Sequence, residues 1–284
     1  MFDVFLDSLI DSVKLLPFLF LTYLVMELLE HNTGDQVRRR IKSAGAFGPL
    51  WGGLLGVLPQ CGFSAAASSL YAGRVITVGT LLAVYLSTSD EMLPVLIAQS
   101  AGADMIIKIL AMKVLIAVFS GFLAEIVYTR CLKRKEKEMD IHTVCEEEHC
   151  RCEEGVFLSA VKHTGKIFLY LFLISLALNA LIAQIGEDAI SAFFFTVPVL
   201  GEAVAALVGL IPNCASSVVI TELYMGGMIG AGAMMAGLLV NAGVGVLVLF
   251  RLNRDWKQNL GILAALYAFG VFWGCLIRLA GIAF

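Results

Sequence analysis

The stretch GVLPQCGFSAAASSLYAGRVITVGTLLAVYL (56–86) returns 153 positions later as GLIPNCASSVVITELYMGGMIGAGAMMAGLL (209–239). Eleven of the 31 aligned positions are identical, and the alignment needs no gap. Apolar sequences match one another easily, so the shared Gly, Pro, Cys and Tyr residues carry the weight of the comparison. Between the shared proline and cysteine, Gln60 corresponds to Asn213. We infer that the chain arose by internal duplication.

The composition is that of a membrane protein. Hydrophobic residues make up 59% of the chain and charged residues only 15%, with a mean hydropathy of +0.87. A soluble domain carries about 25% charged residues, so we expect lipid rather than water to cover most of the exterior. The net charge of −3 and the lack of a basic stripe with interleaved aromatic residues argue against a nucleic-acid partner.

Long apolar runs predict the membrane spans, since a spanning helix needs about 20 apolar residues. Such runs occupy 12–30, 104–129, 157–184, 228–250 and 259–283. Two further pairs of short runs are each parted by a proline, at 45–58 with 62–73 and at 198–211 with 213–226. A piece of about 14 residues reaches roughly 21 Å, short of a bilayer core of about 30 Å. These pairs therefore predict re-entrant hairpins or short, broken spans.

A third kind of interruption lies within 75–102, where the apolar run stops at Ser87-Thr88-Ser89-Asp90-Glu91. Irregular backbone at membrane depth is tolerated only inside protein or beside a watery cavity. The break therefore indicates a binding site.

The distribution of Lys and Arg predicts the topology, because short loops rich in these residues stay in the cytoplasm. The basic clusters lie at 38–42, 74, 130–137 and 251–257. Placing all of them inside puts both termini outside and makes each half cross an odd number of times. We therefore expect a multi-pass protein of the cytoplasmic (inner) membrane with a first transmembrane repeat at 1–129, a cytoplasmic linker at 130–155 and an inverted second repeat at 156–284.

The predicted fold class is thus all-α: a polytopic membrane protein with about ten helical membrane segments arranged as two inverted repeats with broken helices or re-entrant hairpins. Inverted repeats with discontinuous helices are a recurring plan of secondary transporters, which bind substrate near the midplane where the repeats meet. We expect the two Pro-Gln/Asn-Cys breaks to approach that plane from opposite faces.

The segments LPQCGFSAAASSLYAGR (58–74) and ITVGTLLAVYLSTSDEMLP (76–94) resemble a family of heavy-metal exporters with ten membrane segments. Members of this family carry names such as arsenic efflux protein and manganese transporter. The resemblance covers nearly the whole chain, including the second proline break and the central polar segment. It implies transport of a metal or metalloid ion, and the outward direction of transport comes from the resemblance alone.

Two cysteines are the first candidates for the transport site. Cys61 and Cys214 each follow a helix-breaking proline and lie beside a carboxamide, Gln60 or Asn213. Thiolates favour soft metal ions, whereas manganese prefers carboxylate, carbonyl and water ligands. The alternative is that each cysteine is a small residue that eases helix packing.

Two acids in the interrupted run are the next candidates. Asp90 and Glu91 are placed to ligate a cation or to take up a proton, because ionisable groups inside a membrane mark ion pathways. The equivalent segment of the second half, 240–243, carries no acid, which suits one proton-coupling acid per chain. An acidic loop at the outer surface is the alternative.

Smaller polar side chains complete the predicted substrate site. They lie near the breaks of both halves: Ser64, Ser87, Thr88, Ser89, Ser217, Glu222 and Asn241. Hydroxyl-bearing residues also occur where helices pack closely, so packing is the alternative for the serines.

The central segment IHTVCEEEHCRCEEG (141–155) offers a second metal site. Its nitrogen and thiolate ligands are His142, Cys145, His149, Cys150 and Cys152. Four such ligands suit tetrahedral Zn(II), and paired thiols suit Cu(I). A solvated, charged linker is the alternative.

These observations predict a secondary, proton-coupled exporter of a metal or metalloid ion; the alternative is a transporter of a small organic or inorganic anion. We expect no catalytic residues, since an enzyme with Cys61 as nucleophile would lack a histidine partner within a span. The sequence contains no GxxxxGK[ST] phosphate loop, and no resident cofactor is expected. The expected partners are the transported ion and the lipid bilayer, with a homo-oligomer left open.

Overall fold

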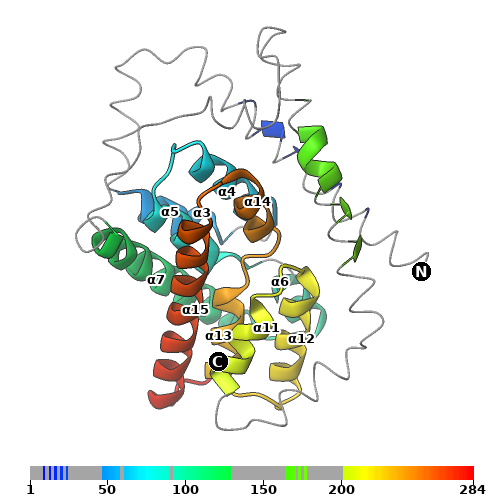
Figure 1. Cartoon of the computed structure of the whole chain (residues 1–284). Coiled ribbons are helices and arrows are strands. Elements are labelled where there is room, and N and C mark those ends of the chain that lie inside the picture. Colours follow the sequence, from blue (N-terminus) through cyan, green and yellow to red (C-terminus); the bar gives the residue numbers. More distant parts are fainter. Residues whose placement is uncertain are drawn as a thin grey trace, which may run out of the picture.

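The computed structural model describes residues 47–57, 61–89, 92–128 and 201–284, with scattered positions between 9 and 24 and between 161 and 177 (Figure 1). The backbone of Cys61 and Cys214 is described, but their side chains are not. Throughout the described ranges the regular elements are helices, so the predicted all-α class is confirmed there.

These helices form two sets of five. The first set is α3 (Gly48–Leu55), α4 (Cys61–Ala72), α5 (Val78–Ser87), α6 (Met92–Ala98) and α7 (Ala103–Ile126). The second set is α11 (Gly201–Gly209), α12 (Cys214–Met225), α13 (Ala231–Val240), α14 (Gly245–Leu252) and α15 (Trp256–Leu279). Each helix of the second set begins 153 positions after its counterpart. The duplication seen in the sequence therefore extends over five helices in each half.

Among the described residues, four segments are long and apolar enough to cross a membrane. They are Val78–Ala98, Ala103–Ile126, Ala231–Leu252 and Trp256–Leu279. The predicted spans at 104–129 and 259–283 thus correspond to α7 and α15. The predicted interruption after residue 86 is also present, since α5 ends at Ser87 and α6 begins at Met92. The predicted spans at 12–30 and 157–184 lie largely outside the described residues.

The predicted span at 228–250 corresponds to Ala231–Leu252, but its helix is divided into α13 and α14. The side-chain Oδ1 of Asn241 accepts a hydrogen bond from the backbone N–H of Gly243 at 3.1 Å. Such a local bond competes with the helical pattern. Gly243 then adopts a left-handed conformation with φ of 52°, which glycine reaches without steric cost. The second half therefore breaks at the same place as the first.

We call α5 with α6, and α13 with α14, the broken helices. Within each half, the first part of the broken helix packs between a short helix and a long one. α5 lies against α3 and α7, and α13 lies against α11 and α15. Glycines allow each long helix to come close to the broken helix. A Cβ on Gly121 of α7 would lie 2.7 Å from the carbonyl oxygen of Gly79 in α5. At the equivalent place, a Cβ on Gly274 would lie 2.6 Å from the carbonyl oxygen of Gly232. Small residues at helix contacts are typical of membrane proteins, where close backbone packing replaces the hydrophobic effect.

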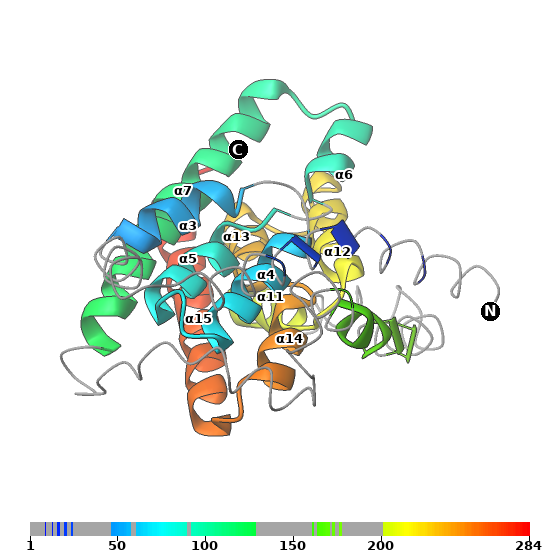
Figure 2. The ribbon, with the colours of Figure 1, turned by 90° about the horizontal axis from the view of Figure 1, so that it is seen from above.

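The short second part of each broken helix, α6 or α14, packs against the other half of the protein. α6 packs on α12 of the second half, and α14 packs on α4 of the first. The long helices cross where Trp273 Nε1 donates a hydrogen bond to Ser120 Oγ at 2.9 Å, and these two positions are equivalent in the duplication. Figure 2 shows α7 and α15 running in opposite senses. The halves are thus interlocked rather than side by side.

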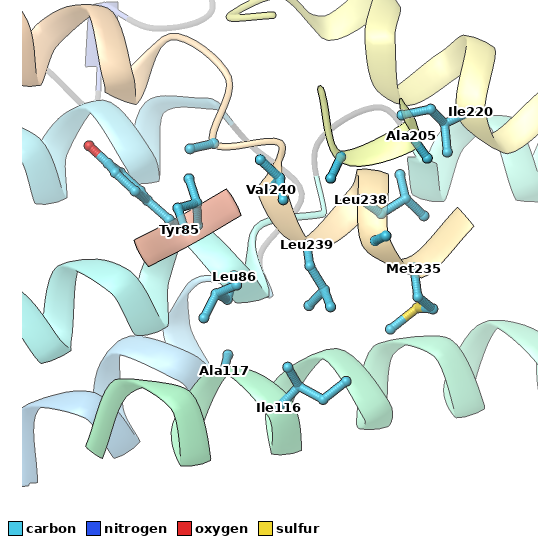
Figure 3. Close-up of a cluster of buried hydrophobic side chains, with 14 of the residues drawn as sticks. Tyr85, Leu86, Ile116, Ala117, Ala205, Ile220, Met235, Leu238, Leu239 and Val240 are labelled. Carbon is cyan, nitrogen blue, oxygen red and sulfur yellow. The ribbon is translucent and has the colours of Figure 1, made fainter. Parts of the chain in front are cut away.

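Burial separates a core from a covering layer. In the two spans that contain the broken helices, Val78–Ala98 and Ala231–Leu252, 69% and 89% of the apolar stretch is buried. In α7 and α15 the buried share is only 33% and 28%. The exposed side chains of these long helices include Ile107, Leu115, Phe119, Leu260 and Phe272. Figure 3 shows the interior, where the equivalent residues Leu86 and Leu239 point toward Ile116 and Ala117 of α7. The broken helices therefore form the centre of the molecule, and apolar helix faces surround them.

Candidate functional site

The broken helices of the two halves end close together in the interior. Thr88 is the C-cap of α5, and Leu238 lies in the last turn of α13. Lys113, from the middle of α7, donates hydrogen bonds to the carbonyl oxygen of Thr88 and, at 3.0 Å, to that of Leu238. The lysine is 1% exposed. One buried ammonium group therefore joins both helix ends.

A second set of hydrogen bonds links the same region to α4 and α14. Ser68 Oγ lies 2.6 Å from Tyr85 Oη of α5 and 2.7 Å from the carbonyl oxygen of Gly245, where α14 begins. Ser68 also bonds to the carbonyl oxygen of Ser64. The backbone of α14 approaches so closely that a Cβ on Gly245 would lie 2.7 Å from Ser64 Cβ. The first turn of α4, which Cys61 opens, therefore lies beside the start of α14.

We call this region the central junction. Its members come from α4, α5, α7, α13 and α14 and are Ser64, Ser68, Tyr85, Thr88, Lys113, Leu238 and Gly245. All of those with polar side chains are buried, with at most 2% of their surface exposed. The arrangement combines one positive charge, several hydroxyl groups and helix-terminal carbonyl groups.

The hydroxyl groups of the first break form hydrogen bonds within the protein. Ser87 Oγ and Thr88 Oγ1 donate to the carbonyl oxygen of Val84, at 3.0 and 2.7 Å. Ser89 Oγ donates to the carbonyl oxygen of Val57, just after α3, at 3.1 Å. These bonds fix the backbone of the break and leave hydroxyl lone pairs as acceptors or ligands. All three hydroxyl residues are buried.

In the second half, the side chains of Asn213 and Asn241 accept hydrogen bonds from backbone groups only two residues away in the chain. Asn213 is the N-cap of α12, and its Oδ1 accepts from the backbone N–H of Ala215 at 3.2 Å. Ser217 and Asn241 are buried, and Asn241 holds the turn after α13. Glu222 is exposed near the end of α12, far along the helix from its N-cap. The structure therefore places Asn241 at the helix break and Glu222 on the surface.

Several predicted site residues lie outside the described part of the chain. They are Gln60, Asp90, Glu91, His142, Cys145, His149, Cys150 and Cys152, together with the side chains of Cys61 and Cys214. Among the side chains that are described, no three His, Cys, Asp or Glu residues come close enough to hold a metal ion together. The predicted metal ligands therefore stay predictions.

Arg74, in the loop between α4 and α5, organises a second, partly buried polar cluster. Its guanidinium donates to Asn253 Oδ1 at 3.1 Å and to Gln258 Oε1 at 3.4 Å. Asn253 Nδ2 donates to Asn259 Oδ1, and Gln258 Nε2 donates to Tyr128 Oη, both at 2.6 Å. We call these five residues the Arg74 network. It connects the loop between α4 and α5 and the end of α7 to Asn253, before α15, and to the first turn of α15.

The backbone at Arg74 has a left-handed conformation, with φ of 59°. The equivalent residue in the second half is Gly227, which has φ of 70°. A residue with a Cβ is strained in this region, whereas glycine is not. The first half therefore carries an arginine where the local backbone favours glycine, and the side-chain bonds of the network offset that strain.

Sequence reasoning missed Lys113 and Tyr85 as site residues and used Arg74 only as a marker of topology. The signal for Lys113 was present, because a lysine in the middle of an apolar run is costly in a membrane and marks function. The partners of Arg74 lie 179 and 184 positions away in the chain. No local pattern predicts such contacts.

Apolar long helices around buried, broken ones define a multi-pass helical membrane protein. The family model described as "Putative, 10TM heavy-metal exporter" matches residues 1–199. The chain belongs to this family, as the resemblance predicted. Neither the curated proteins nor the solved structures gave a match.

Proposed function

We propose that the protein is a secondary active transporter that exports a metal or metalloid ion through the central junction. One observation carries this proposal: a broken helix from each half ends at the same buried polar region, where Lys113 contacts both. Interrupted helices at membrane depth are tolerated only where the backbone is buried in protein or lines a cavity. In transporters built from repeats, the substrate site lies where the repeats meet.

The relation between the halves supports alternating access. Ser120 and Trp273 are equivalent positions and contact one another, as expected beside a two-fold axis, where a patch contacts its own equivalent. α7 and α15 run in opposite senses (Figure 2), so this axis would lie in the plane of the membrane. We therefore propose that the repeats are inverted, with both termini outside and the basic loops inside.

The ligands of the transported ion would come from the two proline breaks. Cys61 and Cys214 are the first residues of α4 and α12, and their thiolates suit a soft or borderline ion. We propose that Gln60 and Asn213 add carbonyl ligands, and that Asp90 or Glu91 takes up the counter-transported proton. The ligands between 142 and 152 would gather the ion on the cytoplasmic side.

One observation favours the alternative of an anionic solute. The buried ammonium of Lys113 supplies a positive charge at the junction, and α4 and α14 both begin there. Helix N-termini carry partial positive charge and favour anions. A small organic or inorganic anion is therefore the second candidate substrate.

A flux assay in proteoliposomes tests the proposal, with a panel of metal, metalloid and oxyanion salts. We expect the parent to move at least one soft metal or metalloid ion with a change in internal pH. Cys61→Ser, Cys214→Ser and Asp90→Asn should each lower this flux about tenfold or more, which corresponds to about 1.4 kcal/mol at the rate-limiting step. Matched controls are Cys275→Ser and Asp104→Asn, because both side chains are exposed. Flux of anions alone would support the second candidate instead.

The inverted orientation has its own test. Ala103 and Trp256 are equivalent first residues of α7 and α15, and both are exposed. In a chain without its native cysteines, Ala103→Cys should react with a membrane-impermeant thiol reagent added outside, and Trp256→Cys only with reagent added inside. Labelling of both variants from the same side would rule out the inverted repeat.

A further inference from the structure

The environment of the Lys113 ammonium is that of an ion site. Two of its acceptors are the carbonyl oxygen of Thr88, at the end of α5, and that of Leu238, at the end of α13. Each half thus contributes one of these ligands. The side chain is buried between them at 1% exposure.

Helix C-termini attract cations. The last four carbonyl groups of a helix lack partners within the helix, and the helix dipole gives this end a partial negative charge. Two such ends that meet in the interior attract a positive charge, because the protein interior screens charges less than water does. In transporters with broken helices, these ends coordinate unattached ions such as Na⁺.

The duplication shows that packing does not require the lysine. The equivalent of Lys113 is Leu266, which is fully buried in α15. The same helix arrangement is therefore compatible with an apolar residue at this place in the second half. A buried charge is costly, so its presence in the first half needs an electrostatic reason.

We propose that the Lys113 ammonium is a resident cation, which occupies a monovalent-cation site formed by the α5 and α13 ends. The attached ammonium takes the place where Na⁺, K⁺ or a small alkylammonium ion would otherwise bind. The protein then needs no unattached monovalent cation at this site. This holds whichever solute the protein transports.

Removal of the lysine side chain should therefore expose a site for small cations. The experiment measures the thermal unfolding midpoint of the purified full-length chain in choline, sodium, potassium and methylammonium chloride, at constant ionic strength and pH. The parent should have the same midpoint in every salt. Lys113→Ala should unfold roughly 10 °C lower in choline, from the loss of two charge-assisted hydrogen bonds. It should recover at least half of this loss in sodium or methylammonium, with a saturable dose dependence.

Two comparisons make the result specific. Lys108→Ala is the matched control, because Lys108 lies on the same helix but is exposed and paired with Asp104 at 2.6 Å; its midpoint should be equal in all four salts. Lys113→Met fills the space without charge and should not be restored by any cation. Recovery of the methionine variant, or no recovery of the alanine variant, would overturn the proposal.

A further variant covers the case in which Lys113→Ala does not fold. Lys113→Gln keeps a hydrogen-bond donor at the carbonyl groups but removes the charge. It should unfold below the parent in all four salts, and a midpoint equal to that of the parent would show that the charge is not needed. None of these measurements depends on metal transport, so this proposal and the proposed function can fail separately.

Discussion

The first half and the second half of the protein share their helices but differ in several of their polar side chains. Equivalent positions hold Lys113 and Leu266, Arg74 and Gly227, and Glu125 and Arg278, as the sequence offset of 153 shows. The close contacts of glycine, by contrast, are repeated nearly atom for atom, with Gly79 on Gly121 and Gly232 on Gly274.

This difference separates what packing requires from what a particular activity requires. Close helix contacts permit few residue types, because an added Cβ has no room, and both halves have kept them. Polar groups follow no such steric constraint, and several of them differ between equivalent places. These asymmetric polar residues are therefore a second place to look for function, beside the shared cysteines of the proline breaks. The following predictions test this comparison, from the largest expected effect to the smallest.

The glycine contacts should be equally sensitive in both halves. Gly121→Val and Gly274→Val force side-chain atoms into the backbone of the facing helix, so each should lower stability by about 3 kcal/mol. The thermal unfolding midpoint in detergent measures this loss. Gly261→Val is the control, because a Cβ on Gly261 meets nothing within 4 Å. Loss in one half only would show that the two contacts are not equivalent.

The central charge should be partly transferable between the halves. Lys113→Leu loses two hydrogen bonds of a charged group and should lower stability by about 2–3 kcal/mol. Asn241 is equivalent to Thr88, and Tyr85 is equivalent to Leu238. The duplication therefore predicts that the carbonyl groups of Asn241 and Tyr85 would accept hydrogen bonds from a lysine at position 266. The double variant, Lys113→Leu with Leu266→Lys, should therefore lose less unfolding free energy than the two single variants together, by about 1 kcal/mol or more. Strict additivity of the two unfolding free energies would contradict this.

Arg74 should show opposing effects of its backbone and its side chain. Arg74→Ala loses the bonds of the Arg74 network and keeps the strain, whereas Arg74→Gly loses the same bonds and relieves it. The glycine variant should be the more stable of the two by about 1 kcal/mol. Gly227→Ala should lose about the same amount, because it introduces the strain in the second half. Equal unfolding midpoints for the two Arg74 variants would show that the conformation is not strained.

The smallest effect concerns a pair of equivalent tyrosines. Tyr224 Oη donates to the carbonyl oxygen of Phe284 at 3.2 Å, so Tyr224→Phe should lower stability by about 1 kcal/mol. Tyr71 Oη is buried and has no hydrogen-bond partner among the described residues, although the Arg74 guanidinium lies 5.3 Å from its ring centre. Tyr71→Phe should therefore change stability by less than about 0.5 kcal/mol. A larger loss for Tyr71→Phe would reveal a partner of that hydroxyl group.

The helices and the first break could be predicted from the sequence because polarity changes there. The run after Leu86 turns abruptly polar at Ser87, and α5 ends at that residue. The second break, at Asn241, is less visible, since one asparagine among Ala, Gly and Val barely lowers the hydropathy. The hydrogen bond between the Asn241 side chain and Gly243 decides the outcome, and hydropathy does not detect it.

The candidate site was predicted only in part, because its geometry depends on contacts between the halves. Ser64 and Thr88, which were predicted because they lie next to helix breaks, belong to the central junction. The sequence shows Lys113 as a charge within an apolar run, but not that the ends of α5 and α13 both contact it. Glu222 was chosen for its acid group, yet it lies exposed. A single sequence does not show which face of a helix turns inward when every face is apolar.

The exchange of α6 and α14 between the halves has a consequence for biosynthesis. α6 is inserted early, yet its packing partner α12 emerges from the ribosome only after the whole first half and the central segment have been made. Domains usually fold in the order of their synthesis, but here the early half stays incomplete until the late half arrives. Neither half expressed alone should therefore reach its native structure, whereas two separately produced halves should assemble in the membrane.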